Sequence, residues 1–185
     1  LLRALHERYG DKFTLEVLGR IASLGIKILL RHGFTIGIAD TDLQNEGTSK
    51  IKSTLDDAEK EVDNLIKTFE RRELEALPGR SLTETLELRI LEVLNKARNR
   101  CGGIAMESSG DNAAVTMARS GARGNMLNIA QMTAVVGQQA LRGKRIEHGY
   151  RGRTLSYFKQ GDLSPAARGF IRHSFKTGMN PAEFF

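Results

Sequence analysis

Two stripes of apolar residues between positions 51 and 97 constrain the fold of this chain more than any other feature. In the first stripe, spacings of four and three residues alternate along Ile51, Leu55, Ala58, Val62, Leu65 and Phe69. That spacing is typical of a helix that packs along one side against another helix. A matching stripe follows at Leu82, Leu86, Ile90, Val93 and Ala97. The sequence therefore predicts two long antiparallel helices that form a hairpin.

Signals at the ends of these stripes indicate where the two helices begin and end. Residues 44–50 are a polar segment that predicts a linker, and Pro78-Gly79 is expected to end the first helix at a tight tip. Ser81 with Glu84 has the spacing of a capping box, which starts the second helix. Cys101-Gly102-Gly103 is expected to break it. The outer face of the first helix is acidic, as in a solvated, projecting element, with Asp56, Asp57, Glu59, Glu61 and Asp63.

The segment before the hairpin predicts one more helix and a short strand. After a lead-in of ten residues, Asp11 to His32 has apolar residues near helical spacing, and Gly33 follows as a C-terminal cap. Apolar and small residues then alternate over 34–39, which favours a short strand or an extended segment. Asp40-Thr41-Asp42 is interpreted as a turn and helix cap in preference to a metal site.

After the hairpin, the chain alternates between short helices and glycine-rich loops. Residues 112–119 predict a short helix that ends at Gly121. Residues 126–136 predict a helix that is apolar nearly all round and therefore buried. Four amides interrupt this region and need hydrogen-bond partners if buried: Asn128, Gln131, Gln138 and Gln139.

The last part of the chain predicts a loop or β-hairpin over 143–152 and two helices after it. Ser164-Pro165 is expected to open a helix with Phe170, Ile171 and Phe175 on its buried side and Gly178 as its end. Asn180-Pro181 begins one further turn, after which the sequence stops, and we expect the chain to be a fragment. The predicted fold class is mainly α with short β segments.

The basic residues are unevenly distributed. The net charge is +6, and the segment 117–176 contains only two acids, Glu147 and Asp162. Its bases are Arg119, Arg123, Arg142, Lys144, Arg145, Arg151, Arg153, Lys159, Arg168, Arg172 and Lys176. Such a block attracts phosphates, or else it is a solvated face or a contact with an acidic neighbour. Arg123 lies between Gly121 and Gly124, where its planar guanidinium is well placed to meet an anion.

Composition excludes several kinds of site. The single cysteine, Cys101, leaves no internal disulfide and no cysteine-based zinc site, which suits a reducing cytoplasm. No apolar run reaches the length of a membrane span, and no signal peptide is visible. Without tryptophan, and with few aromatics, stacking on bases is not expected to carry binding. His148 and His173 are expected to be surface or packing residues.

Two long motifs resemble a known family. SGARGNMLNIAQMTAVVGQQALRGKRI and GYRGRTLSYFKQGDLSPAARGFIRHSFKTGMNPAEFF are similar to the pore and funnel region of the largest subunit of multisubunit DNA-directed RNA polymerase, in its archaeal (A′-type) and eukaryotic form. GFTIGIADT and VLNKARNRCGGIA match more loosely, so the resemblance covers essentially the whole chain. It implies a pore region over 1–50, the funnel hairpin over 51–102, more pore with basic lining over 103–179, and the start of a following helix over 180–185.

The resemblance also implies roles for single residues. Arg123 matches a basic residue, often lysine, that touches the triphosphate of an incoming nucleotide. Asn95 and Arg98 match positions that face the pore. Gln138 and Gln139 match amides beneath the bridge helix, where eukaryotic enzymes bind a cyclic-peptide toxin. Ala140, where toxin-sensitive enzymes often have serine, departs from that pattern.

Asn128 and Gln131 are interpreted as hydrogen-bonding supports near the bridge helix. The hairpin resembles the funnel helices on which transcript-cleavage factors dock, and Glu59 and Glu61 are candidate docking residues. The catalytic Mg²⁺ of the complete enzyme is held by a triple-aspartate loop, which this sequence lacks, so the fragment alone is expected to be inactive and to hold no cofactor.

The expected partners are other polymerase subunits, nucleoside triphosphates, cleavage factors, and DNA and RNA through the complete enzyme, with no membrane. PGRSLTETLE and GYRGRTL favour an archaeal, cytoplasmic protein, and a eukaryotic paralogue would be nuclear. Two alternatives remain open: a free-standing basic module that binds nucleic acid through 119–176, and a hairpin adaptor that uses only 51–97.

Overall fold

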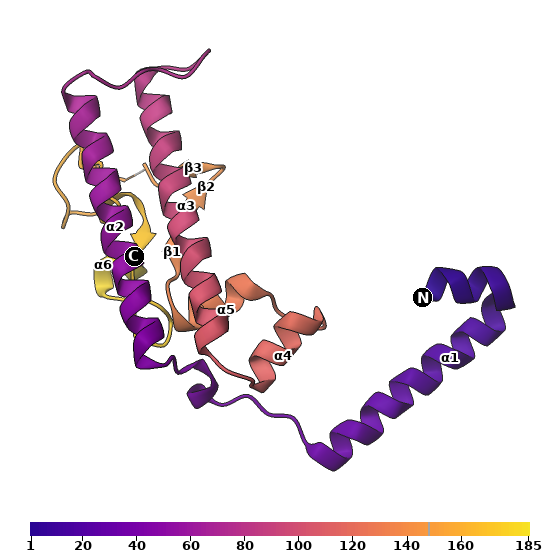
Figure 1. Cartoon of the computed structure of the whole chain (residues 1–185). Coiled ribbons are helices and arrows are strands. Elements are labelled where there is room, and N and C mark those ends of the chain that lie inside the picture. The colour runs from indigo at the N-terminus through magenta and orange to yellow at the C-terminus, as the bar shows by residue number, and fades with distance from the viewer. Residues whose placement is uncertain (148) are drawn as a thin grey trace. The chain divides into compact units, whose positions relative to one another are not determined.

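Helices make up most of the chain, which confirms the predicted fold class (Figure 1). The computed structural model describes residues 1–147 and 149–185 and divides into two units, 1–36 and 37–185. The helices are α1 (Leu2–His32), α2 (Asn45–Glu70), α3 (Leu82–Ser108), α4 (Ala113–Ser120), α5 (Met126–Thr133) and α6 (Pro181–Phe184). The strands are β1 (Gly137–Gln138), β2 (Ala140–Leu141), β3 (Lys144–Arg145) and β4 (Phe170–Ile171). In the described residues, no helix combines the length and apolar character needed to cross a membrane.

The first unit is dominated by α1. This helix begins at Leu2, so the expected start at Asp11 was wrong. The interruption is at Gly10, whose φ of 76° and ψ of 179° separate two helical pieces. The predicted cap at Gly33 is confirmed, because its N–H donates to the carbonyl of Leu29 at 2.8 Å.

Of the two alternatives for 34–39, the extended segment agrees with the structure and the strand does not: residues 33–37 belong to no helix or strand, and Gly37 is extended, with φ of −108° and ψ of 165°. A 3₁₀ helix, Ile38–Thr41, takes up the last two residues of this range. The Asp40 carboxylate accepts the N–H of Gly37 at 2.9 Å, and the Thr41 hydroxyl donates to the carbonyl of Ile38 at 2.6 Å. These local hydrogen bonds compete with extended structure. The turn-and-cap interpretation of 40–42 is confirmed.

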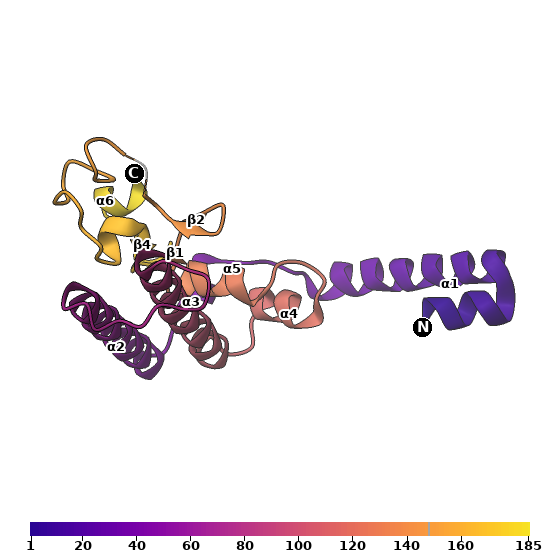
Figure 2. The ribbon, with the colours of Figure 1, turned by 90° about the horizontal axis from the view of Figure 1, so that it is seen from above.

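The hairpin is the core of the second unit. In both views α2 and α3 lie side by side and antiparallel (Figures 1 and 2). Ile51, Leu55 and Val62 are buried in the same cluster as three residues of α3, namely Leu86, Ile90 and Leu94. The predicted stripes are confirmed except at Leu82, which is 41% exposed, and fully buried Leu94 was not assigned to them.

The helix α3 does not break at the glycines. It continues to Ser108, with Cys101 and Ala105 fully buried. Gly102 marks a close approach of α5: a Cβ atom there would lie 3.2 Å from the Cβ of Ala130. The glycine therefore allows two helices to pack closely, and the prediction of a break was wrong.

The ends of α2 also differ from expectation. The helix begins at Asn45, inside the predicted linker, and ends at Glu70, well before Pro78-Gly79. The tip over 71–81 is long and held by buried Leu74 and by the N–H of Leu77, which donates to the Thr85 hydroxyl at 3.0 Å. Ser81 starts α3 with the predicted capping box.

The predicted helix over 126–136 is shorter and less buried than expected. The short helix before it, α4, ends at Gly121 as predicted, and Asn112, which was expected to be its first residue, is its N-cap. However, α5 ends at Thr133, and Met126 is 51% exposed. The chain leaves the helix because its backbone pairs with a later segment: the N–H of Val136 donates to the carbonyl of His173 at 2.9 Å.

That pairing also explains the missing helix after Pro165. Only a 3₁₀ turn, Ala166–Arg168, forms before β4 pairs antiparallel with β1, with Gly137 opposite Ile171. Phe170 is buried, but Phe175 is 54% exposed and does not belong to a buried helical face. A second two-stranded sheet, β2 with β3, turns at Arg142-Gly143, and its second strand lies at the start of the predicted loop or hairpin over 143–152. Asn180 and Pro181 start α6 as expected.

Candidate functional site

The turn between α4 and α5 presents Arg123. Gly121 and Gly124 have φ values of 72° and 74°, a left-handed conformation that glycine adopts without strain. Arg123 is exposed between them. Asn125 then caps α5, since its side-chain oxygen accepts the N–H of Asn128 at 2.9 Å. The turn therefore offers a solvent-exposed guanidinium on a short, geometrically defined loop.

The four predicted amides lie on different elements. Asn128 and Gln131 belong to α5, where Asn128 is exposed and Gln131 is partly buried. The carbonyl of Gln131 accepts the N–H of Phe175 at 3.0 Å. Gln138 is buried in β1, and Gln139 beside it is exposed. The four amides therefore do not lie on one face of a single helix.

Gln138 is the amide with the most restricted surroundings. Its Nε2 donates to the carbonyls of Gln139 at 2.7 Å and Arg168 at 2.8 Å, and so ties β1 to the 3₁₀ turn. Its Oε1 is buried without a hydrogen-bond partner among the described residues. The preceding Gly137 lies under the Arg98 side chain, where a Cβ atom would be 2.8 Å from Cδ. Arg98 thus packs against β1, and Asn95, three residues earlier on α3, is also partly buried.

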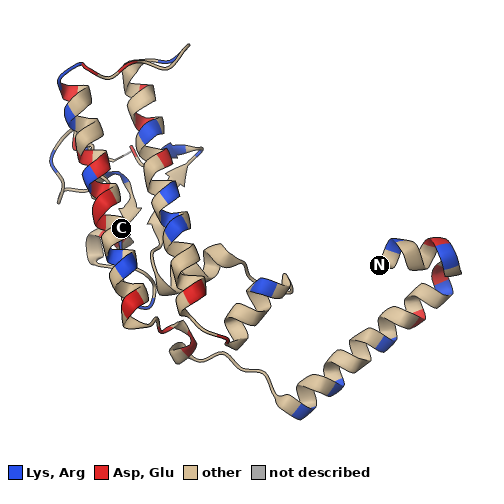
Figure 3. Cartoon of the chain, in the orientation of Figure 1, with Lys and Arg blue, Asp and Glu red and all other residues tan. Residues whose placement is uncertain are grey.

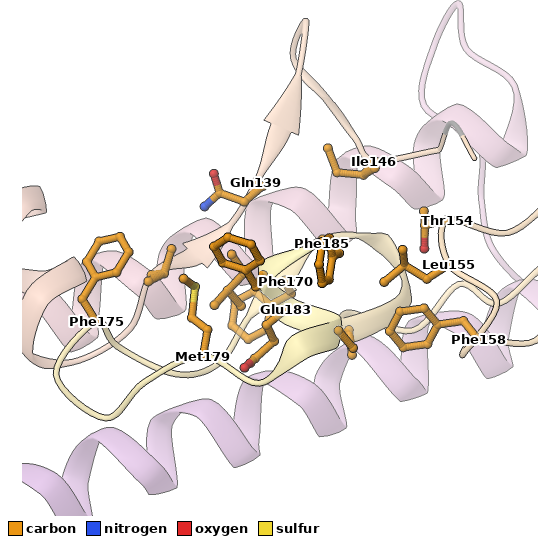
Figure 4. Close-up of a pocket in the computed structure, with 16 residues that line it drawn as sticks. Gln139, Ile146, Thr154, Leu155, Phe158, Phe170, Phe175, Met179, Glu183 and Phe185 are labelled. Carbon is orange, nitrogen blue, oxygen red and sulfur yellow. The ribbon is translucent and has the colours of Figure 1, made fainter. Parts of the chain in front are cut away.

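A pocket of about 480 Å³ lies beside Gln139 (Figure 4). Side chains from distant parts of the second unit surround it, among them Ile146, Phe158, Phe170, Met179 and Phe185. Its polar side chains are few, including Gln139, Thr154 and Glu183. Sequence patterns did not predict this pocket, because it depends on the pairing of β1 with β4.

Internal contacts neutralise much of the basic block. Arg145 has a fully buried side chain, and it binds Glu87 through Nε and Nη2 at 2.7 and 2.9 Å. It also donates to the carbonyl of Leu163 at 3.1 Å. Lys176 contacts the Asp42 carboxylate at 2.8 Å. Of the alternatives for the basic block, Arg145 and Lys176 fit neither a phosphate contact nor a solvated face, because each pairs with an acid of this chain.

The acidic face of α2, visible in Figure 3, is also partly occupied. Arg172 binds Asp56 and Glu59 of α2, with 2.5 Å between its Nη1 and the Glu59 carboxylate. Glu59 is therefore partly buried, contrary to the expectation of an exposed side chain, whereas Glu61 is exposed. Burial raises the pKa of Glu59 despite the attraction of Arg172. The hydrogen bond from Arg172 lowers the pKa of the more solvated Asp56.

The groups that catalysis and metal binding commonly use are engaged elsewhere. Burial raises the pKa of the Cys101 thiol to about 11, so it is not a nucleophile at neutral pH. His173 pairs with Glu183 at the surface, Nδ1 to Oε2 at 2.7 Å, which agrees with a surface role. The expectation for His148 lies outside the described residues. Within 1–147 and 149–185, no group of three or more His, Cys, Asp or Glu side chains is arranged to hold a metal ion.

Comparison with known proteins gives a consistent result. The family model described as RNA polymerase Rpb1, domain 4, matches residues 66–171. The chain is 48% identical over 180 residues to DNA-directed RNA polymerase subunit Rpo1N of Halococcus morrhuae, covering 97% of this chain and 52% of that protein. It is 45% identical to the subunits of the same name from Methanocaldococcus jannaschii and Methanothermobacter thermautotrophicus, covering 100% of this chain and 14% and 22% of those proteins. The chain thus spans about half the length of the first relative and less of the others.

Proposed function

Because this chain belongs to the RNA polymerase Rpb1 domain 4 family, as its sequence motifs predicted, we propose that it is the pore and funnel portion of the largest subunit of a DNA-directed RNA polymerase. In this proposal it lines the channel through which nucleoside triphosphates enter, and its hairpin docks transcript-cleavage factors. Its other partners are the remaining polymerase subunits, with DNA and RNA bound by the complete enzyme.

The observation that carries this proposal is the hairpin itself. Helices α2 and α3 bury one seam against each other, while α2 keeps Asp57, Glu61 and Asp63 exposed on its other side. A long helical pair that is charged on its outer face is suited to project into solvent and to receive a partner. A basic segment of a cleavage factor has the charge that this face would attract.

Arg123 supports the nucleotide-entry part of the proposal. A guanidinium on an exposed turn attracts a triphosphate and forms paired hydrogen bonds to phosphate oxygens, with geometry that lysine lacks. The flanking glycines leave the approach to the turn open, since a Cβ atom at either would meet nothing within 4 Å. Arg123 would therefore guide the substrate and take no part in bond making.

The chemistry of nucleotidyl transfer would lie outside these residues. When bound in the complete enzyme, Mg²⁺ stabilises the charge that develops on the reacting phosphate. This chain would contribute positive lining through Arg123, and support through Gln138, Arg98, Asn95, Asn128 and Gln131. The role of each of these residues remains a prediction.

Arg123→Ala in the complete polymerase tests the proposal. We expect the KM for nucleotides to rise about fivefold, as for the loss of one solvent-exposed charge contact, with kcat at saturating nucleotide and subunit assembly unchanged. Lys159→Ala is the matched control, because Lys159 is also an exposed cation but lies outside the turn. Normal elongation by the Arg123 variant at limiting nucleotide would contradict a role in nucleotide entry.

A further inference from the structure

Arg172 joins the hairpin to the C-terminal part of the chain. It directly follows β4, and its guanidinium binds two acids that lie one turn apart on α2, Asp56 and Glu59. The three side chains are between 31% and 40% exposed, so the cluster is accessible from solvent. One internal cation therefore already binds two acids of the hairpin helix, including the candidate docking residue Glu59.

The backbone of the same arginine is attached to the start of α6. The N–H of Arg172 donates to Glu183 Oε1 at 2.9 Å. The other oxygen of Glu183 accepts the N–H of Asn180 at 3.0 Å and contacts His173 Nδ1 at 2.7 Å. Burial alone would raise the pKa of Glu183, but these donors outweigh it and lower the pKa, so the carboxylate stays ionised and bound.

Glu61 provides the contrast within α2. It is exposed, and no hydrogen bond or ion pair involves it among the described residues. A docking partner that touches Glu61 meets a free carboxylate. A partner that touches Asp56 or Glu59 meets carboxylates whose charge Arg172 already balances.

We propose that Arg172 is an internal competitor for the docking surface, so that a basic segment of a cleavage factor binds Asp56 and Glu59 only by displacing it. Displacement frees the residue whose backbone holds Glu183, and it therefore loosens the start of α6. This inference rests on the proposed docking role of the hairpin and adds a regulatory consequence: factor binding on α2 and the order of residues 172–184 oppose each other.

The proposed competition predicts the direction in which the affinity for the cleavage factor changes when Arg172 is removed. The apparent affinity of a partner falls in proportion to the fraction of molecules whose binding surface is free. Removing Arg172 makes that fraction close to one. A partly exposed ion pair stabilises the form in which Arg172 covers Asp56 and Glu59 only modestly. In the variant without Arg172, we therefore expect the dissociation constant of the cleavage factor to fall about threefold to fivefold. A simple loss of structure at the docking surface would change affinity in the opposite direction.

The test uses the assembled polymerase with Arg172→Ala and the purified cleavage factor as the probe. The dissociation constant is measured by fluorescence anisotropy, and amide hydrogen exchange is followed over residues 172–184. We expect tighter factor binding and, without factor, faster exchange in this segment than in the wild type. Adding factor to the wild type should accelerate exchange in the same segment.

Two further variants separate the possible failures. Lys176 is a cation in the same segment, but its side chain pairs with Asp42 and not with an acid of α2. Lys176→Ala should therefore leave the affinity for the cleavage factor unchanged. Glu61→Gln should weaken binding without changing exchange over 172–184. If Glu61→Gln weakens binding while Arg172→Ala leaves it unchanged or weaker, the competition is wrong. If factor binding responds to neither variant, the hairpin is not the docking surface, and the docking part of the proposed function fails while its nucleotide-entry part is still tested by Arg123→Ala.

Discussion

The α2–α3 hairpin and the segment 134–185 are stabilised in different ways. The hairpin is regular, and its stability comes from one apolar seam whose residues repeat along each helix. The later segment has strands of two residues each and a four-residue helix. It is held against the hairpin by buried Val135 and Phe170 and by two arginine clusters.

The two arginine clusters join residues that are far apart in sequence. Arg145 binds Glu87, 58 residues earlier, and Arg172 binds Glu59, 113 residues earlier. The hairpin can thus form from two helices that are adjacent in sequence, whereas the later segment can pack only after the hairpin has folded. From this difference we expect hairpin mutations to affect the whole second unit and cluster mutations to affect mainly the later segment.

The largest effect is expected in the hairpin seam. Leu94→Ala removes a fully buried side chain from the contact between α2 and α3. Lost burial and the remaining cavity should lower the free energy of unfolding by about 4 kcal/mol, measured by urea denaturation with circular dichroism. Lys96→Ala, an exposed position on the same helix, is the control. A loss below about 1 kcal/mol would mean that the seam does not dominate the stability of this unit.

Breaking the buried ion pair should have the next largest effect. Arg145→Ala leaves Glu87 without its partner in a largely buried position, at a cost of about 3 kcal/mol. Hydrogen exchange should become faster over 134–147 while the hairpin amides remain protected. Lys144→Ala, the exposed neighbour, should change stability by less than about 0.5 kcal/mol.

A double variant tests whether the pair acts as a unit. If Arg145 and Glu87 interact as the structure indicates, Glu87→Ala with Arg145→Ala should cost less than the sum of the two single changes. Additive losses would mean that Arg145 stabilises the segment through its packing and its bond to the Leu163 carbonyl alone.

The same difference explains how much of the fold the sequence predicted. Periodicity and capping identified the hairpin, the start of α3 at Ser81, the end of α4 at Gly121 and the caps at Gly33 and Asn180, because each depends on residues a few positions apart. The predictions failed where a distant segment decided the structure. Val136 left its predicted helix to pair with His173, and Gly102 stayed helical because Ala130 packs against it.

The same contrast between local signals and distant contacts applies to the candidate site. The two glycines that flank Arg123 are a local signal, and they predicted the exposed turn that presents it, whereas its role in nucleotide entry stays a prediction from the resemblance. The partners of Arg145 and Arg172 were missed, since charges in a sequence do not show which acid they meet. A hint existed for Arg172: Asp56 and Glu59 lie three residues apart and next to the buried stripe of α2, where carboxylates need partners.

The smallest effect is expected at the capping box of α3, which is local and exposed. Ser81→Ala removes the hydroxyl that accepts the N–H of Glu84 at 3.2 Å. The free energy of unfolding should fall by about 1 kcal/mol, measured by urea denaturation at neutral pH. Thr83→Ala, at an exposed position in the same turn, is the control. Since no distant segment contributes to this cap, exchange over 134–185 should stay at wild-type values.

The contribution of this capping box to stability depends on pH, because Glu84 titrates. The backbone N–H of Ser81, and then its hydroxyl, lower the pKa of Glu84 below its ordinary value of 4.5. In the unfolded chain this carboxyl titrates near 4.5, so its contribution is complete above that pH and is lost as the pH falls through the lower folded value. Glu84→Gln keeps an acceptor but no titratable group, and its stability should therefore decline less than that of the wild type on acidification from about pH 5 to about pH 3. Equal declines would show that the Glu84 carboxylate does not accept hydrogen bonds from Ser81 in solution. The capping box would then contribute less to the stability of α3 than its sequence predicts.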